Sequence, residues 1–271
     1  MNFENIFAVA GKVVCVTGGG GGIGRGIAGG FVAGGARVYI ASRSDLSEVA
    51  KELDAEGPGE CIALRADLSK DEDISGLVSQ LQEREGKLDV LINNAAHGNF
   101  MHEFEDFPMD DWDRMNAVNV RAPFALTKGC LPLLALAGES GEHASVINIA
   151  SVDGIRIPGD NDWAYGQGKA GLIHLTRQWA GRLGNNGGRE GGRNITFNVI
   201  APGPFPGMLD HFLATEEGVA MVSAVTTIGR VGKPEDMGAA CVFLSSRGGS
   251  YITGAVLPVD GGLLVGPSAN Q

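Results

Sequence analysis

The regular alternation of short apolar runs with helical patterns limits the fold of this chain more than any other feature. The alternation extends over the whole length and predicts a parallel sheet with helices on both faces. The apolar runs are nearly continuous, as expected for strands that are covered on both sides. We therefore expect an α/β fold with a doubly wound parallel sheet in three layers. The expected strands are Val13–Thr17, Arg37–Ala41, Cys61–Ala66, Val90–Asn93, Ser145–Ala150, Thr196–Ile200 and Val256–Val259.

Three helix starts carry specific sequence signals. Ser44 is expected to cap a helix that ends near Gly57. Ser69 and Glu72 have the pattern of a capping box, ahead of a segment with apolar residues on one face. Pro234 suits the first turn of a helix near the C-terminus.

The size and charge of the chain narrow its class. Its 271 residues can bury a large core, so we expect residues 1–271 to form a single domain with a flexible loop near 184–192. The net charge of -11 argues against nucleic-acid binding, which needs a basic face. It also argues against docking on anionic membranes.

Cysteine spacing and the first residues bear on location. The four cysteines are widely spaced, without a CxxC pair or a nearby histidine cluster, so neither a metal site nor a redox motif is expected. The first residues lack the basic start and apolar core of a signal peptide. No apolar run reaches the roughly 18 residues needed to span a bilayer. A cytoplasmic protein is the resulting expectation.

A glycine-rich turn follows the first expected strand, in the sequence TGGGGGIG at 17–24. Glycines between a strand and a helix let the backbone approach a pyrophosphate, and the helix N-terminus offers free N–H groups and a partial positive charge. Gly18, Gly22 and Gly24 have the spacing TGxxxGxG. The pattern indicates a dinucleotide cradle, and a glycine turn without a ligand is the alternative.

The end of the second strand bears on the choice of cofactor. An acidic residue there would bind the 2′-hydroxyl of NAD, whereas this chain has Ser42 and Arg43. These suit a 2′-phosphate, because Arg pairs with phosphate bidentately. NADP(H) is therefore favoured over NAD(H), with a merely solvated Arg43 as the alternative. We expect Asp67 to meet the adenine, and Asn94 and Ala95 to pass along the ribose.

Tyr165 and Lys169 are four residues apart, so on a helix they share one face. A nearby ammonium is expected to lower the pKa of the phenol from about 10 toward the working range. Tyr165 would then serve as an acid for a carbonyl oxygen or as a base for an alcohol. Ser151 closes an apolar strand at the edge where parallel sheets bind ligands, and its hydroxyl is expected to hold the substrate oxygen. An end-of-strand cap is the alternative role for Ser151.

Taken together, these motifs show that the chain resembles the short-chain dehydrogenase/reductase family along nearly all its length. The resemblance implies one doubly wound, Rossmann-type domain that uses NAD or NADP and is commonly a homotetramer. The matching segments are TGGGGGIG at 17–24, AD at 66–67, NNAA at 93–96, AVNV around Asn119, IASV around Ser151, YGQGK at 165–169, NVIAPGP at 198–204 and GAVLPVDGG at 254–262.

The resemblance implies roles for further residues. Asn119 matches the asparagine that anchors a water and connects Lys169 to solvent, and Lys169 would also bond the nicotinamide ribose. Pro202 and Gly203 match the turn beside the nicotinamide, where Phe205 or Ile200 would pack on the ring. The expected catalytic residues are Ser151, Tyr165, Lys169 and Asn119, and the residues expected at the cofactor are Gly18, Gly20, Gly21, Gly22, Ile23, Gly24, Ser42, Arg43, Asp67, Leu68, Asn94, Ala95, Tyr165, Lys169, Pro202, Gly203 and Phe205.

The chain departs from the family pattern in three places. Gly21 stands where members often have a basic residue for the 2′-phosphate, and Gly207 stands where many have a Thr that bonds the carboxamide. The interval before Tyr165 is one residue longer than usual and holds Asp160 and Asp162. This insertion is expected to reshape the wall of the substrate pocket.

The expected reaction is hydride transfer from NADPH to a ketone, with Tyr165 donating a proton to give a secondary alcohol. The segment Phe205–Thr226 is expected to form an apolar lid over the substrate, with a packing helix or a subunit contact as the alternative.

The substrate is less well defined than the reaction. Because the APGPFPGM stretch resembles that of 3-oxoacyl reductases, a 3-oxoacyl thioester is the first choice, followed by a bulky or aromatic ketone. A sugar or polyol dehydrogenase and a non-catalytic nicotinamide-binding sensor are the alternatives.

Overall fold

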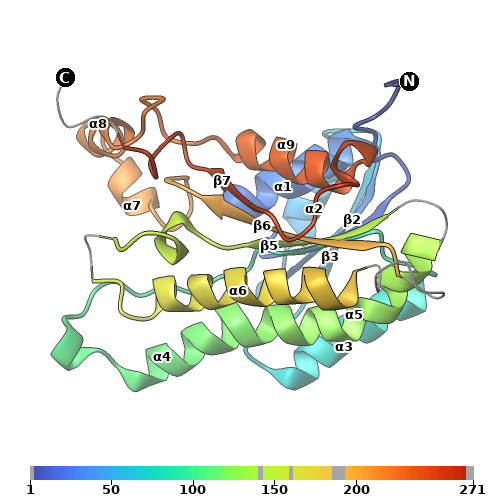
Figure 1. The fold of residues 1–271 in the computed structure, drawn as a ribbon, viewed down its shortest axis with the longest axis horizontal. Helices are drawn as coiled ribbons and strands as arrows, with labels where there is room; N and C mark the ends of the chain where they lie inside the picture. Colours follow the sequence, from blue (N-terminus) through green and yellow to red (C-terminus); the bar gives the residue numbers. More distant parts are fainter. Residues whose placement is uncertain (1–2, 140–142, 159–160, 185–192, 267–271) are drawn as a thin grey trace.

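A sheet of seven parallel strands forms the centre of the computed structural model, which describes residues 3–139, 143–158, 161–184 and 193–266 (Figure 1). The strand order is β3-β2-β1-β4-β5-β6-β7, and every neighbouring pair is parallel. The predicted doubly wound parallel sheet is therefore confirmed. The strands are β1 (Val13–Thr17), β2 (Arg37–Ser42), β3 (Glu60–Arg65), β4 (Val90–Asn93), β5 (Ala144–Ile149), β6 (Ile195–Pro202) and β7 (Val256–Val259).

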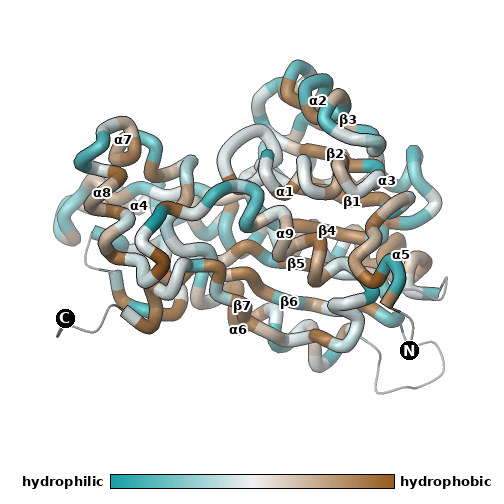
Figure 2. Tube along the Cα trace, turned by 90° about the horizontal axis from the view of Figure 1, so that it is seen from above, coloured by the Kyte–Doolittle hydropathy of each residue, from teal (hydrophilic) through white to brown (hydrophobic). Residues whose placement is uncertain are grey.

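Helices cover both faces of the sheet and give the predicted three layers (Figure 1). One face carries α1 (Gly22–Ala33), α2 (Ser47–Asp54) and α9 (Pro234–Ser245). The other face carries α3 (Asp71–Arg84), α5 (Ala122–Glu139) and α6 (Tyr165–Leu183). The central strands are buried between two apolar clusters and are coloured as hydrophobic in Figure 2. Their continuous apolar sequence follows from this double cover.

The shorter elements gather mainly at the ends of the strands. They are η1 (Phe104–Asp106), α4 (Met109–Asn116), the π turn η2 (Ala117–Arg121), η3 (Val152–Gly154), α7 (Asp210–Leu213), α8 (Glu216–Ala224) and η5 (Arg247–Gly249). In Figure 1, α7 and α8 lie at the same end of the molecule as α4.

One continuous helix, residues Met109–Glu139, is long and apolar enough to cross a membrane by length and composition alone. The sequence prediction considered only uninterrupted apolar runs and did not identify this segment. Its α5 part packs against α3 and the sheet, as the core helix of a globular protein does.

The start of α2 differs from the prediction. The helix begins at Ser47 rather than after Ser44, because Asp45 Oδ1 accepts the Ser47 backbone N–H at 2.9 Å and its hydroxyl at 2.6 Å. The helix ends at Asp54, so Gly57 lies beyond its last turn.

The predicted capping box of α3 is also wrong. The helix begins at Asp71, and the Ser69 hydroxyl donates to Asp67 Oδ1 at 2.7 Å instead of meeting Glu72. In contrast, Pro234 does occupy the first turn of α9, as predicted.

The order of the strands reverses between β1 and β4, since β2 and β3 lie to one side and β5, β6 and β7 to the other. Parallel sheets bind ligands outside the carboxyl ends of the strands at such a point. Some predicted features lie outside the described residues, namely 185–192 of the loop and Asp160 in the interval before Tyr165.

Candidate functional site

The glycine turn lies at the carboxyl end of β1, where the strand order reverses. Gly18 has a φ of +68°, which favours glycine. A Cβ on Gly24 would lie 2.1 Å from the Gly18 carbonyl oxygen, so this position tolerates no side chain. At Gly21 a Cβ would meet nothing within 4 Å, so the backbone there is open to a ligand.

The turn is tied to the end of β4 by a compact set of hydrogen bonds. Asn94 Nδ2 donates to the Thr17 carbonyl at 2.8 Å and to the Gly18 carbonyl at 3.1 Å. Thr17 Oγ1 accepts the backbone N–H groups of Asn94 and Ala95, each at 3.0 Å. The Asn94 amide therefore holds the two strand ends together.

The start of α1 has the properties of an anion site. Its N-cap is Gly21, no described side chain caps it, and its first turn contains no acidic residue. The first N–H groups of a helix without a cap are free to bind a phosphate, and the helix dipole favours negative charge there. The turn thus fits the pyrophosphate of a dinucleotide.

Two arginines lie side by side at the ends of β2 and β3. Ser42 pairs with Arg65 in the strand register, and Arg65 Nε donates to the Arg43 carbonyl at 3.1 Å. Both arginine side chains are exposed. Sequence reasoning named Arg43 and missed Arg65, which only the register of β2 with β3 brings to the same place.

The segment after β3 has a strong local structure of its own. Asp67 accepts the Ser69 hydroxyl and backbone N–H, and these bonds hold the pKa of its carboxyl below the usual range. The Leu68 side chain is buried in the core, so only its backbone can face a ligand.

Tyr165 and Lys169 both lie in the first turns of α6, and both are buried. Lys169 Nζ lies 5.3 Å from the centroid of the Tyr165 ring. The Lys169 ammonium donates to the Ile149 carbonyl at the end of β5, at 2.8 Å. The predicted sharing of one helix face is therefore present, with the lysine turned toward the sheet.

The electrostatic state of the pair differs from the sequence expectation. Burial raises the pKa of the Tyr165 phenol well above its usual range, and the charges of Asp153 and Asp162 raise it further, while a hydrogen bond with Ser151 lowers it. Burial lowers the pKa of Lys169 to about 7. The predicted lowering of the tyrosine pKa is thus wrong for this structure, because a low dielectric disfavours both charged forms.

Ser151 lies two residues after the end of β5 and is buried beside Tyr165. Its Oγ accepts the Asp153 backbone N–H at 3.1 Å and donates to Asp153 Oδ2 at 3.2 Å. The Ser151 hydroxyl therefore makes a local capping contact, and the same hydroxyl is the group that is expected to hold the substrate oxygen. Asp153 is a second residue that sequence reasoning missed.

Asn119 lies in the π turn η2 and is buried. Its Oδ1 accepts the His97 backbone N–H and its Nδ2 donates to the His97 carbonyl, both at 2.8 Å. The side chain therefore fixes the loop after β4. The water that the family resemblance implies stays a prediction.

Apolar side chains surround the Tyr165 ring. Phe100 packs edge-on against it with 5.5 Å between the ring centroids, and Trp112 and Met115 belong to the same cluster. A Cβ on Gly98 would lie 2.9 Å from the Phe100 ring and 3.3 Å from Met208 Sδ, so the two side chains approach each other there.

The turn after β6 contacts the glycine turn. A Cβ on Gly22 would lie 2.8 Å from the Pro206 carbonyl oxygen. Gly207 has a φ of +124° and donates its N–H to Asp210 Oδ1 at 2.7 Å. This conformation explains why a threonine is absent at position 207, since residues other than glycine rarely adopt it.

Other residues expected at the nicotinamide lie in the core. Ile200 is fully buried, and the Phe205 ring is buried against Gly232. Gly203 donates to the Val259 carbonyl at 3.0 Å and so joins β6 to β7. In contrast, Met208 and Phe212 are nearly half exposed.

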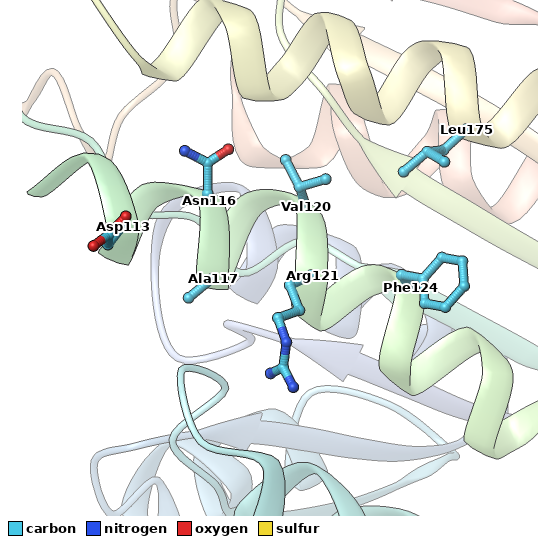
Figure 3. Close-up of a pocket in the computed structure, with 7 residues that line it drawn as sticks. All are labelled: Asp113, Asn116, Ala117, Val120, Arg121, Phe124 and Leu175. Carbon is cyan, nitrogen blue, oxygen red and sulfur yellow. The ribbon is translucent and has the colours of Figure 1, made fainter.

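A groove of about 380 Å³ lies away from this site, between the α4–α5 helix and α6 (Figure 3). Its lining includes Val120, Phe124 and Leu175, which Figure 3 shows on facing helices, and it contains none of the expected catalytic residues.

Comparisons with known proteins agree with this geometry. A family model described as enoyl-(acyl carrier protein) reductase matches residues 18–264. The chain is 38% identical over 259 residues to a rhamnolipids biosynthesis 3-oxoacyl-[acyl-carrier-protein] reductase of Pseudomonas aeruginosa, covering 94% of this chain and 97% of that protein. It is 32% identical over 259 residues to an L-rhamnose 1-dehydrogenase (NAD(P)(+)) of a Sphingomonas species, covering 94% and 97%.

A solved structure has nearly the same fold. The Pseudomonas aeruginosa RhlG/NADP active-site complex superposes with a TM-score of 0.88 at 38% sequence identity, covering 97% of this chain and 99% of that one.

Proposed function

This chain belongs to the short-chain dehydrogenase/reductase family of oxidoreductases, and on that premise we propose that it reduces a ketone to a secondary alcohol with NADP(H). One observation carries the proposal: Tyr165 and Lys169 lie buried beside Ser151 near the carboxyl end of β5, at the same edge of the sheet as the glycine turn that follows β1. This is the edge of the sheet where a nicotinamide and a substrate carbonyl can meet.

Tyr165 donates the proton in this proposal. The raised pKa of its phenol keeps it protonated at neutral pH, so it can give a proton to the developing alkoxide. The bound cofactor supplies the hydride. Ser151 holds the carbonyl oxygen beside the phenol. Lys169 is fixed to the Ile149 carbonyl, and its Nζ lies 5.3 Å from the centroid of the Tyr165 ring.

The NADP(H) preference is supported by the ends of β2 and β3, since Gly21 gives the glycine turn no basic side chain for a 2′-phosphate. Arg43 and Arg65 place two exposed guanidinium groups at the ends of neighbouring strands. Guanidinium groups bind phosphate bidentately, so two of them favour a 2′-phosphate over a hydroxyl. The related Pseudomonas aeruginosa structure, which is described as an NADP complex, supports the same choice.

The cofactor proposal is tested by fluorescence titration of NADPH and NADH. Arg43→Ala should weaken NADPH binding by about 10-fold or more and leave NADH binding nearly unchanged, because only NADPH carries the phosphate. Equal affinity of the wild type for both nucleotides contradicts the proposal.

The apolar wall supports an acyl or bulky ketone as the substrate. Phe100 and Met208 approach each other beside Tyr165, and neither offers a hydrogen bond to a sugar hydroxyl. We therefore place a 3-oxoacyl thioester first and a bulky apolar ketone second. Phe205–Thr226 is proposed as the lid, supported by the exposed apolar side chains of Met208 and Phe212.

Turnover decides between these substrates and the alternatives. A panel of 3-oxoacyl thioesters, aryl ketones and a 2-enoyl thioester with NADPH should show NADPH oxidation with the first two classes, and sugars with NADP⁺ should show little NADP⁺ reduction. Tyr165→Phe should lose most of this turnover and still bind NADPH. If a sugar is oxidised faster than any ketone is reduced, the result favours a sugar dehydrogenase, which is the activity named for the Sphingomonas relative.

We also propose a homotetramer in the cytoplasm, built from one domain per chain. Phe124 and Leu136 on α5 are about half exposed, and the groove beside Phe124 is apolar, so a second copy can cover this helix face. All four cysteines are free and buried, as is usual in reducing compartments. Sedimentation of the wild type and of Phe124→Asp tests the assembly, and only the wild type should be tetrameric.

A further inference from the structure

Asp153 contacts the site directly, two residues after Ser151. Ser151 Oγ donates to Asp153 Oδ2 at 3.2 Å, and the Asp153 backbone N–H donates back to Ser151 Oγ at 3.1 Å. Asp153 Oδ1 accepts from Arg156 Nε at 3.1 Å. Asp153 thus fixes the Ser151 hydroxyl from two sides and is itself held by an exposed cation.

Ser151 has one hydroxyl proton, and its neighbours compete for it. A carboxylate is a stronger acceptor than a neutral phenol, so Asp153 takes this proton and leaves an Oγ lone pair facing Tyr165. The 3.2 Å distance is long for a bond to a carboxylate, which is typically about 2.5–2.7 Å. The Ser151 hydroxyl can therefore exchange its hydrogen bond to Asp153 for one to a substrate oxygen without losing a strong bond.

A second acid holds the other side of the first turn of α6. Both oxygens of Asp162 accept the Gly166 backbone N–H, at 2.8 and 2.9 Å. A Cβ on Gly166 would lie 2.8 Å from the Asp153 carbonyl oxygen and 2.8 Å from Asp162 Oδ2. Gly166, the residue after Tyr165, therefore packs closely against both Asp153 and Asp162.

The remaining neighbours of Tyr165 do not offset this negative charge fully. Lys169 Nζ is bonded to the Ile149 carbonyl, and its charge is disfavoured by burial. Phe100 and Met115 pack on the ring from the loop after β4 and from α4, and both are apolar.

His97 in the loop after β4 and Asp111 and Arg114 on α4 are ionisable groups of those two elements that interact with one another. His97 Nε2 lies 3.9 Å from Asp111 Oδ1, and the pKa of His97 is lowered by burial and by the charge of Arg114. A neutral imidazole adds no positive charge near the phenol.

Building on the proposed ketone reduction, we propose that Asp153 is a positioning residue, which orients the Ser151 hydroxyl through its carboxylate and its backbone N–H and holds a negative charge next to that hydroxyl. The charge of Asp153 disfavours phenolate, so Tyr165 stays a proton donor to higher pH than it would beside a neutral residue. Arg156 moderates this effect, because it neutralises part of the charge.

The direct test replaces Tyr165 with a fluorinated tyrosine, whose more acidic phenol titrates within an accessible range, and follows the phenolate absorbance. Asp153→Asn keeps the shape of the side chain and removes its charge. The midpoint of the phenolate titration should be about one pH unit lower in Asp153→Asn than in the protein with Asp153, which is a tenfold change in the ratio of phenolate to phenol. An unchanged midpoint in a variant with a wild-type circular dichroism spectrum overturns the proposal.

Arg156→Gln is the matched control, since it leaves Asp153 in place and removes the opposing charge. The midpoint of the phenolate titration should rise in Arg156→Gln, and a lower midpoint in this variant also overturns the proposal. In the unmodified enzyme, the alkaline limb of ketone reduction should move to lower pH in Asp153→Asn, by the same amount as the titration midpoint. If no ketone is turned over, the proposed function fails, while the titration still decides the role of Asp153.

Discussion

Lys169→Met is expected to make the cofactor-free protein more stable below neutral pH, although it removes an expected catalytic residue. Lys169 is buried, and its ammonium donates a 2.8 Å hydrogen bond to the Ile149 carbonyl. Burial lowers its pKa from 10.5 to about 7. Below that pH the folded protein must hold a charge that water would solvate better in the unfolded chain.

The size of the effect follows from this shift. Between pH 7 and pH 10.5 the unfolded chain binds more protons at Lys169 than the folded protein does, so stability rises with pH across this window. The full cost of the charge, present below pH 7, is about 5 kcal/mol. Methionine loses the bond to the Ile149 carbonyl, worth ~1 kcal/mol. The net gain at pH 6 is then on the order of 3–4 kcal/mol.

Urea unfolding of the cofactor-free protein at pH 6, 7, 8 and 9 measures this difference. The free energy of unfolding of the wild type should rise by about 2–3 kcal/mol from pH 6 to pH 9 relative to that of Lys169→Met. Lys128→Met, at an exposed position on α5, is the control and should follow the wild type in its pH dependence. A difference between wild type and Lys169→Met that does not change with pH would refute the reasoning.

Three further substitutions test other parts of the structure. Gly24→Ala should lower the free energy of urea unfolding by about 2–3 kcal/mol and abolish NADPH binding, because the alanine methyl group would lie 2.1 Å from the Gly18 carbonyl oxygen. Gly21→Ala is the control and should retain NADPH binding, because a methyl group there meets nothing within 4 Å. Asp89→Ala should cost about 2–4 kcal/mol, because this buried carboxylate accepts a β1 backbone N–H at 2.8 Å, and a thermal midpoint equal to that of the wild type would contradict this. Thr176→Val should cost about 1–3 kcal/mol, because it removes the 2.7 Å acceptor of the buried Asn148 amide; an unchanged urea midpoint would argue against it.

The sheet could be predicted because its central strands β1, β4, β5 and β6 are buried on both faces and so have a nearly continuous apolar sequence. The starts of α2 and α3 could not, because more than one side-chain oxygen competes for the same donors. Ser44 and Ser69 match the sequence pattern of a cap, but Asp45 and Asp67 accept the nearby hydroxyl and N–H groups first. A carboxylate accepts more strongly than a hydroxyl, and the sequence pattern alone does not rank the two.

The candidate site was likewise predictable only in part from the sequence. The spacing of Tyr165 and Lys169 was enough to predict a shared helix face, but the pKa of the tyrosine depends on burial and on Asp153, which spacing does not reveal. Arg65 became visible only through the register of β2 with β3. Gly207 was recognised as a departure from the family, and its φ of +124° supplies the reason.

The π turn between α4 and α5 has a consequence for how this helix tolerates insertions and deletions. A π turn takes one residue more than an α turn, so removal of one residue from Ala117–Arg121 would restore regular helix geometry. The removal would leave α4 and α5 nearly in register. If the present sequence formed a regular α-helix instead, the additional residue would rotate α4 by about 100° relative to α5. Met115 would then leave the Tyr165 ring, or Leu126 would leave the core. The π turn therefore absorbs the additional residue, so that Met115 contacts Tyr165 and Leu126 lies in the core on one continuous helix.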